Sequence, residues 1–185
     1  EKKWADEVVP GIVVGDAVYL ELKQGHKFLT LLTEAKDAKV ALVVVHGMGI
    51  HPDWGMVGTL RTELAEKGYT TLSVQMPVQA NDAKAEQYAA TFPEAAERIG
   101  VAVDFLKAKG YQKIAIVSHS MGSRMSRVYV AKHQDKLVAW ASLGIGGGDT
   151  YTGVKIPVLD LYGENYLPPV LTNVKKRASS LKGNA

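Results

Sequence analysis

The hydrophobic positions of this chain follow two patterns, and together they predict strands that alternate with helices. Short continuous runs rich in Val, Ile and Leu, such as 40–45 and 113–117, are typical of parallel strands buried on both faces. The segment 92–110 instead repeats its apolar residues at the three- and four-residue spacing of a helix. The predicted strands span 12–22, 27–33, 40–45, 70–75, 113–117, 137–143 and 156–162. The predicted helices span 56–67, 92–110, 121–133 and 168–181.

This alternation predicts an α/β fold with a mostly parallel central sheet flanked by helices. A chain of 185 residues has the length of one domain with a sizeable core, so residues 1–185 are predicted to form a single domain. Ligands of such sheets bind beyond the carboxyl ends of the strands. The connection 144–155 is too short for a cap domain, which predicts an open site.

Composition and charge narrow the classes of function. The formal net charge is +3 and 22% of the residues are charged, which is ordinary for a globular protein. One dense basic cluster near the C-terminus is interpreted as the solvated face of a terminal helix, so no nucleic-acid partner is predicted. This cluster consists of Lys175, Lys176, Arg177 and Lys182. The absence of cysteine excludes disulfides and thiolate metal sites, and no apolar run has the length of a transmembrane helix.

Candidate chemistry is concentrated at the end of the strand 113–117. There the chain enters the pattern small-x-Ser-x-Gly, formed by Ser118, Ser120 and Gly122, and a predicted helix begins at once. In this strand-turn-helix context the central serine has a strained backbone, and its hydroxyl is exposed above the sheet. The helix N-terminus behind it supplies free N–H groups and a positive dipole end, which favour an oxyanion. Ser120 is therefore a candidate nucleophile.

Other loops carry weaker signals. The glycine-rich loop 144–149 lacks the Gly-Lys-Ser/Thr ending of a phosphate-binding loop, so no nucleotide cofactor is predicted from it. His46, His51 and Asp53 lack a paired arrangement on one helix, so no metal site is predicted. Among the tryptophans, Trp54 is the one expected to line a pocket.

The order of these motifs resembles the α/β-hydrolase superfamily over roughly residues 27–170. His46-Gly47 follows the third predicted strand, the serine motif follows the fifth, and Leu161–Asn165 follows the seventh. Three shorter stretches resemble an uncharacterised bacterial subgroup whose members are often exported: His51–Trp54, Gln75–Pro77 and Asn81–Lys84. The chain also begins at Glu1 rather than methionine, as it would after removal of a signal peptide. We therefore expect a periplasmic or exported protein, with the cytoplasm as the alternative.

The resemblance implies hydrolysis of a small ester-like substrate through a serine, a histidine and an acid, without a cofactor. Ser120 would attack the carbonyl carbon, and the backbone N–H groups of Met48 and Met121 would form the oxyanion hole. The same resemblance assigns His46 and Gly47 a supporting role in the oxyanion loop. His46 is not expected to be the base, because the catalytic base of this superfamily comes last in the chain.

The acid of the implied triad has three candidates. Many relatives carry an Asp three residues after the glycine that ends the seventh strand, and Tyr166 occupies that place here. Glu164 in the same loop is the first candidate, followed by Asp149 after the sixth strand and Asp160 within the seventh.

No histidine follows these acids in the chain. The last one, His133, is expected several helical turns from Ser120, and His119 is expected to support the turn while pointing away from the serine. His51 is the remaining histidine that could enter the cleft. We therefore expect a C-terminally incomplete chain, with the last strand and the catalytic histidine beyond Ala185. The alternative is a catalytically silent binding or assembly protein, with a partner covering the open edge of the sheet.

Overall fold

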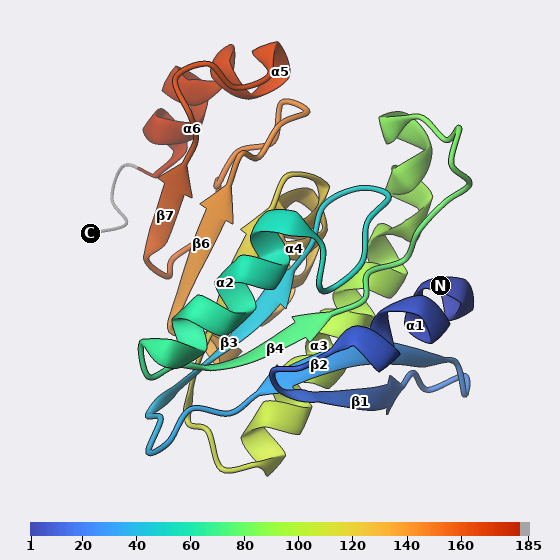
Figure 1. Cartoon of the computed structure of the whole chain (residues 1–185). Helices are drawn as coiled ribbons and strands as arrows, with labels where there is room; N and C mark the ends of the chain where they lie inside the picture. Colours follow the sequence, from blue (N-terminus) through green and yellow to red (C-terminus); the bar gives the residue numbers. More distant parts are fainter. Residues whose placement is uncertain (182–185) are drawn as a thin grey trace.

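The computed structural model describes residues 1–181, and seven strands of this part form one sheet (Figure 1). The strands are β1 (Asp16–Glu21), β2 (Lys27–Thr33), β3 (Val40–Val45), β4 (Thr70–Val74), β5 (Lys113–His119), β6 (Ala139–Leu143) and β7 (Val158–Leu161). Their order in the sheet is β1-β2-β4-β3-β5-β6-β7. β2 is antiparallel to both of its neighbours, and β3 to β7 are parallel to one another. The mostly parallel sheet predicted from the apolar runs is therefore confirmed.

Helices cover both faces of this sheet. The α-helices are α1 (Lys2–Val8), α2 (Gly55–Glu66), α3 (Phe92–Ala108), α4 (Met121–His133), α5 (Pro168–Leu171) and α6 (Val174–Ser180). Short 3-10 helices span Val9–Gly11, Ala85–Thr91 and Gln134–Lys136. α2 lies on one face, and α3 and α4 pack against each other on the opposite face (Figure 1). Within residues 1–181, no helix has the length and apolar character needed to cross a membrane.

The main core lies between the sheet and the pair of helices α3 and α4. Val43 of β3 and Ile116 of β5 are completely buried there, in one cluster with Ile99 of α3 and Val130 of α4. Removal of these side chains from water is the main force that holds the layers together. This packing explains why the strand sequences are continuously apolar instead of alternating.

The sheet order places two loops side by side. β3 and β5 are adjacent and in a register that pairs Val45 with Ser118, so their carboxyl ends meet at the same edge. From β3 the chain crosses to β4 on one side and later returns to β5 on the other side. This is the topological switch point at which α/β sheets bind their ligands.

The N-terminal residues depart from the prediction. The segment 2–11 is helical, although no element was predicted there, and the first strand begins at Asp16 instead of residue 12. The reason is a turn at Gly15, where φ is +81° and a Cβ atom would overlap the carbonyl oxygen of Leu32. Only glycine tolerates this conformation readily, and Val13 before it is 94% exposed.

The C-terminal helix predicted over 168–181 is instead two short helices, α5 and α6. Between them Thr172 and Asn173 donate side-chain hydrogen bonds back to the carbonyl oxygens of Pro168 and Pro169, at 3.0 and 3.2 Å. Such local bonds compete with a continuous helix at this point. α6 ends at Ser180 and Leu181 follows it, while residues 182–185 lie outside the described part of the chain.

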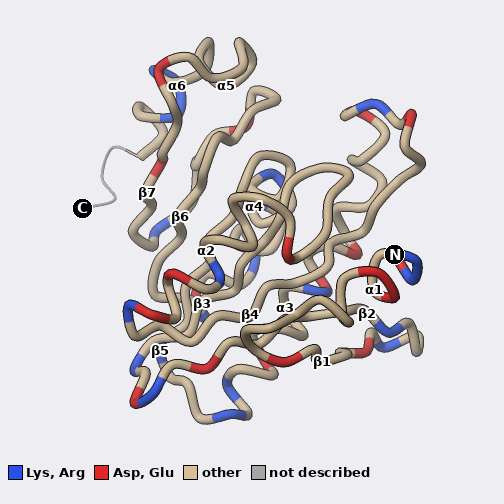
Figure 2. Tube along the Cα trace, viewed as in Figure 1, with Lys and Arg blue, Asp and Glu red and all other residues tan. Residues whose placement is uncertain are grey.

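The interpretation of the C-terminal basic cluster as a solvated face was wrong for Arg177. Its side chain is completely buried and its Nε donates to Asp160 Oδ2 at 2.8 Å, whereas Lys175 and Lys176 are exposed. Lys182 lies outside the described residues. Elsewhere basic and acidic residues are interspersed along the trace (Figure 2).

β7 is the edge strand of the described sheet, next to β6. Its alternate residues Leu159 and Leu161 are 57% and 54% exposed. An exposed apolar edge is a site where another strand can pair.

Candidate active site

The backbone of Ser120 has the conformation expected of a serine at a strand-to-helix turn. It lies between β5 and α4 with φ of 53° and ψ of −118°. A positive φ in a residue with a side chain is uncommon and persists only where the surroundings hold it. Here Ser120 N–H donates to the carbonyl oxygen of Leu143 at 2.8 Å, and Ser120 O accepts from Ser123 N–H at 3.0 Å. These bonds fix the serine between the end of β6 and the first turn of α4.

The two small residues that flank the serine in its motif, Ser118 and Gly122, are required for different structural reasons. A Cβ atom on Gly122 would overlap the carbonyl oxygen of His46, so glycine lets α4 approach the loop after β3. Ser118 is buried, and its Oγ accepts from Trp140 Nε1–H at 2.8 Å and lies 3.0 Å from Ser123 Oγ. The hydroxyl group of Ser118 therefore links β5 to β6 and to α4.

His46 braces the loop after β3. Its side chain is completely buried. Nδ1 lies 2.8 Å from Gly47 O, while Nε2 lies 2.9 Å from Met76 N and 3.0 Å from Gln75 Nε2. Because a carbonyl oxygen only accepts and a backbone N–H only donates, these contacts fix the neutral tautomer with the proton on Nδ1. Burial lowers the pKa of His46 to about 4, so it is uncharged at neutral pH.

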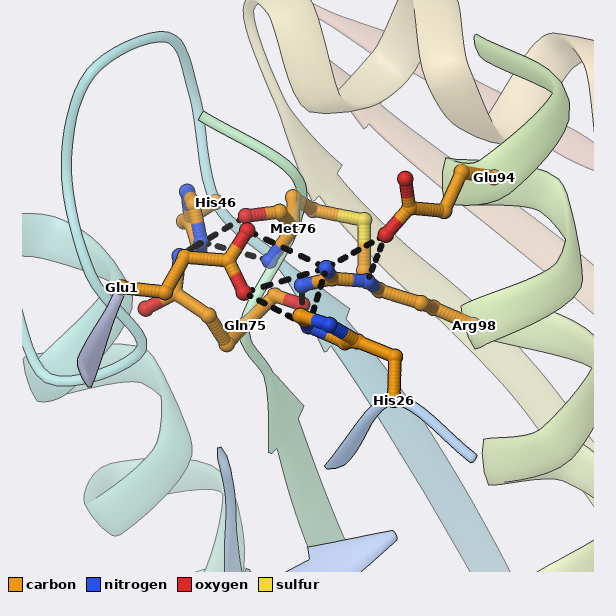
Figure 3. A network of polar contacts seen from close by, with 7 residues as sticks. All are labelled: Glu1, His26, His46, Gln75, Met76, Glu94 and Arg98. Atoms are coloured by element: carbon orange, nitrogen blue, oxygen red, sulfur yellow. Dashed lines mark hydrogen bonds and ion pairs between the residues drawn. The ribbon is translucent and has the colours of Figure 1, made fainter. Parts of the chain in front are cut away.

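Arg98 of α3 anchors the residues that hold His46 (Figure 3). Its side chain is 1% exposed, and Nη1 donates to Gln75 O at 2.8 Å. Nη2 lies 2.6 Å from a carboxylate oxygen of Glu94 and 3.0 Å from one of Glu1. His26 Nε2 lies 3.3 Å from Nη2. A continuous set of polar contacts therefore links α3, the N-terminus and the strand end that bonds to His46.

A hollow of about 360 Å³ opens beside Ser120. Its walls include Gly47, Met48, Ile50, Trp54, Met56 and Ser120. The proposed oxyanion residues are both near the serine, because Met48 lines this hollow and Met121 is the first residue of α4. N–H groups in the first turn of a helix have no acceptor within the helix, so that of Met121 is available for an oxyanion.

His119 and Tyr166 form an unexpected contact near the serine. His119 Nε2 lies 2.8 Å from Tyr166 Oη, although 47 residues separate them in the chain. The tyrosine ring lies against Gly144, where a Cβ atom would overlap it. Burial lowers the pKa of His119 and raises the pKa of the Tyr166 hydroxyl. The residue in the expected place of the acid therefore holds the histidine next to the nucleophile.

The three candidate acids lie in different surroundings. Glu164 is exposed, and its Oε1 accepts from Nδ2 of the neighbouring Asn165 at 3.5 Å. Asp149 forms an ion pair with Arg124 at 2.6 Å. The carboxylate of Asp160 accepts hydrogen bonds from Tyr151 at 2.9 Å and from Arg177, which makes it part of the protein interior. Within residues 1–181, none of these carboxylates bonds to a histidine.

In the part of the chain from 1 to 181, no histidine forms a hydrogen bond with Ser120 Oγ, although His119 lines the same hollow as the serine. The ring of His51 makes edge contacts with those of Trp4 and Trp54, with centroids 6.0 and 5.4 Å away, and its Nδ1 accepts from Asp53 N–H at 3.3 Å. Over the same residues, no three His, Asp or Glu side chains are grouped as they would be around a metal ion.

Comparisons with known proteins agree with this geometry at the level of the fold. A family model described as "Protein of unknown function (DUF3530)" matches residues 16–98, which is less than half of the chain. No curated protein sequence gives a significant match.

Several solved structures share the arrangement of strands and helices. Dienelactone hydrolase from Anabaena variabilis is 19% identical, with 91% of this chain and 81% of that chain covered and a TM-score of 0.73. Est1E from Butyrivibrio proteoclasticus with bound ferulic acid is 20% identical, with 70% and 53% covered and a TM-score of 0.57. Proline iminopeptidase from Mycobacterium smegmatis is 17% identical, with 71% and 44% covered and a TM-score of 0.55. The protein therefore has an α/β-hydrolase fold.

Proposed function

We propose that this protein is a serine hydrolase that cleaves carboxylic esters with Ser120 as the nucleophile. The observation that carries the proposal is the strained backbone of Ser120, with φ of 53°, at the junction of β5 and α4. The close approach of Gly122 to His46 O supports it, because this approach sets the first turn of α4 beside the loop that contains Met48. The α/β-hydrolase fold is compatible with this chemistry but does not specify it.

In the proposed reaction, Ser120 Oγ attacks the ester carbonyl carbon while its proton passes to a general base. The N–H groups of Met48 and Met121 stabilise the resulting oxyanion, and each such donor typically lowers the barrier by about 3 kcal/mol. The bond to the alcohol oxygen then breaks, and the base returns the proton to the departing alcohol. Attack by water on the acyl-serine releases the acid and restores the hydroxyl group.

The proposal needs a base that the described residues do not place at Ser120. It assigns this role to a histidine beyond Ala185, with the exposed carboxylate of Glu164 available to orient it. His51 is the alternative base, and it would have to leave its place beside Trp4 and Trp54. His46 is not a candidate, because both of its ring nitrogens are engaged in buried hydrogen bonds.

The test is covalent labelling with a fluorophosphonate, followed by intact-mass measurement and peptide mapping. We expect one adduct, on Ser120, which the Ser120→Ala variant loses. Ser179→Ala is the matched control, because Ser179 is an exposed serine on α6, and it should label like the unchanged protein. A protein that takes no adduct, or takes it on another serine, would contradict the assignment of the nucleophile.

A second function is favoured by the apolar surface at β7. A shallow hollow of about 560 Å³ extends over β3, β5, β6 and β7, and Val138 and Leu159 on it are 42% and 57% exposed. Large exposed apolar patches often mark contacts with other proteins. If the protein is a catalytically silent binding protein, it should take no fluorophosphonate and should form a complex through this face, detectable by sedimentation.

A further inference from the structure

Three exposed apolar side chains line the hollow beside Ser120. Trp54 is 57% exposed, Met56 45% and Met48 43%, and all three line the same hollow as the serine. Single exposed apolar residues are common on protein surfaces, but a group around one concave site points to a ligand. We propose that this hollow binds the apolar chain of an uncharged ester. This inference rests on the proposed role of Ser120.

The hollow has no charged partner for an anionic or cationic ligand. Among residues 1–181, no Asp, Glu, Lys or Arg side chain lines it. The first arginine of α4, Arg124, is paired with Asp149 at 2.6 Å. A charged chain would lose part of its hydration here without gaining an ion pair, which is unfavourable. The ligand is therefore neutral.

The size of the hollow limits the length of this chain. About 360 Å³ is available, and at about 30 Å³ for each water-sized group it holds roughly a dozen such groups. An apolar chain of about six to ten carbons fits this space. Longer chains would extend into solvent without further burial.

The walls combine a fixed element with adaptable ones. Trp54 is the residue before α2, its N–H donates to His51 O at 3.1 Å, and its ring packs edge-on against the His51 ring at 5.4 Å. These contacts hold the indole in place. Met48 and Met56 are unbranched and flexible, so they can adjust to chains of different shape. Trp54 is therefore the residue on which chain-length preference depends most.

Binding can be tested without catalysis in the Ser120→Ala variant. Methyl hexanoate, methyl acetate and monomethyl adipate are titrated by ligand-observed NMR, the last being an equally long but charged chain. Each buried methylene improves binding by about two- to fourfold. We expect methyl hexanoate to bind at least about tenfold more tightly than either of the other esters.

Two further variants in the Ser120→Ala background locate the binding site. Trp54→Ser should weaken hexanoate binding about tenfold. Leu159→Ser is the matched control, because it removes an exposed apolar side chain from the separate hollow at β7, and it should change nothing. Equal affinity for the three esters, or loss of binding in Leu159→Ser instead of Trp54→Ser, would overturn the proposal.

The outcome also separates this inference from the proposed function. Selective hexanoate binding together with an absence of fluorophosphonate labelling would retain the apolar site and reject the nucleophile. Labelling of Ser120 without any chain-length preference would retain the nucleophile and reject the apolar site.

Discussion

Acidification should destabilise this protein through His46, whose buried imidazole resists protonation in the folded state. Burial is the main cause of its lowered pKa, and the nearby charges of His51, Arg98 and His119 lower it further. The hydrogen bond to Gly47 O opposes these effects. Protonation would also place a hydrogen on Nε2, which faces the N–H of Met76 at 2.9 Å. The charged form therefore does not fit the folded contacts.

The size of the effect follows from the difference between the folded and unfolded pKa values. The pKa falls from 6.5 to about 4 on folding, which corresponds to roughly 3 kcal/mol at about 1.36 kcal/mol for each pKa unit. Between these two values the unfolded chain binds a proton that the folded chain does not. The free energy of unfolding therefore decreases as the pH falls through this window, and roughly 2 kcal/mol is lost between about pH 6.5 and pH 5.

Urea unfolding at a series of pH values measures this loss. The unchanged protein should show the full decrease, and His46→Gln should show a decrease smaller by roughly 2 kcal/mol over the same range. His133→Gln is the control, because His133 is exposed at the end of α4, and it should retain the full decrease. If His46→Gln does not fold, NMR titration of the unchanged protein replaces it. Equal pH dependence in both proteins, or an imidazole of His46 that titrates near 6.5, would refute the reasoning.

Two other substitutions test the contacts that hold the site. Gly122→Ala should destabilise the protein by at least about 1–3 kcal/mol, because the added methyl group overlaps His46 O. Thermal unfolding measures this loss, and Gly11→Ala, at a position with open space, should leave the unfolding temperature within about 2 °C. Arg98→Met should reduce the free energy of unfolding by about 2–3 kcal/mol, because it leaves the buried carbonyl of Gln75 unpaired. Glu94 and Glu1 are 39% and 23% exposed and can be hydrated instead. Urea unfolding checks this value, and an unchanged midpoint would contradict the role of the network.

Much of the fold could be predicted from the sequence because the pattern that indicates each strand or helix lies within that element. The apolar runs of β3 and β5 and the helical spacing of α3 lie within single elements, so they could be recognised without knowledge of the rest. The same holds for the serine motif, since glycine at 122 and a small residue at 118 are needed by the turn itself. The error at the N-terminus also has a local cause, the positive φ of Gly15, which was not recognised in the sequence.

The remaining features depend on residues that only folding brings together. Arg98 contacts Glu1 across 97 positions, and His119 contacts Tyr166 across 47. Arg177 belongs to the interior because Asp160 on a neighbouring element pairs with it, although its sequence context predicted a solvated face.

The sequence by itself thus determined the layers of the fold and the turn that presents Ser120, because short-range backbone preferences and burial patterns specify both. The tertiary structure alone decided which charges became buried partners and which apolar side chains surround the serine. These depend on the relative positions of packed elements, and no local pattern in the chain encodes such positions.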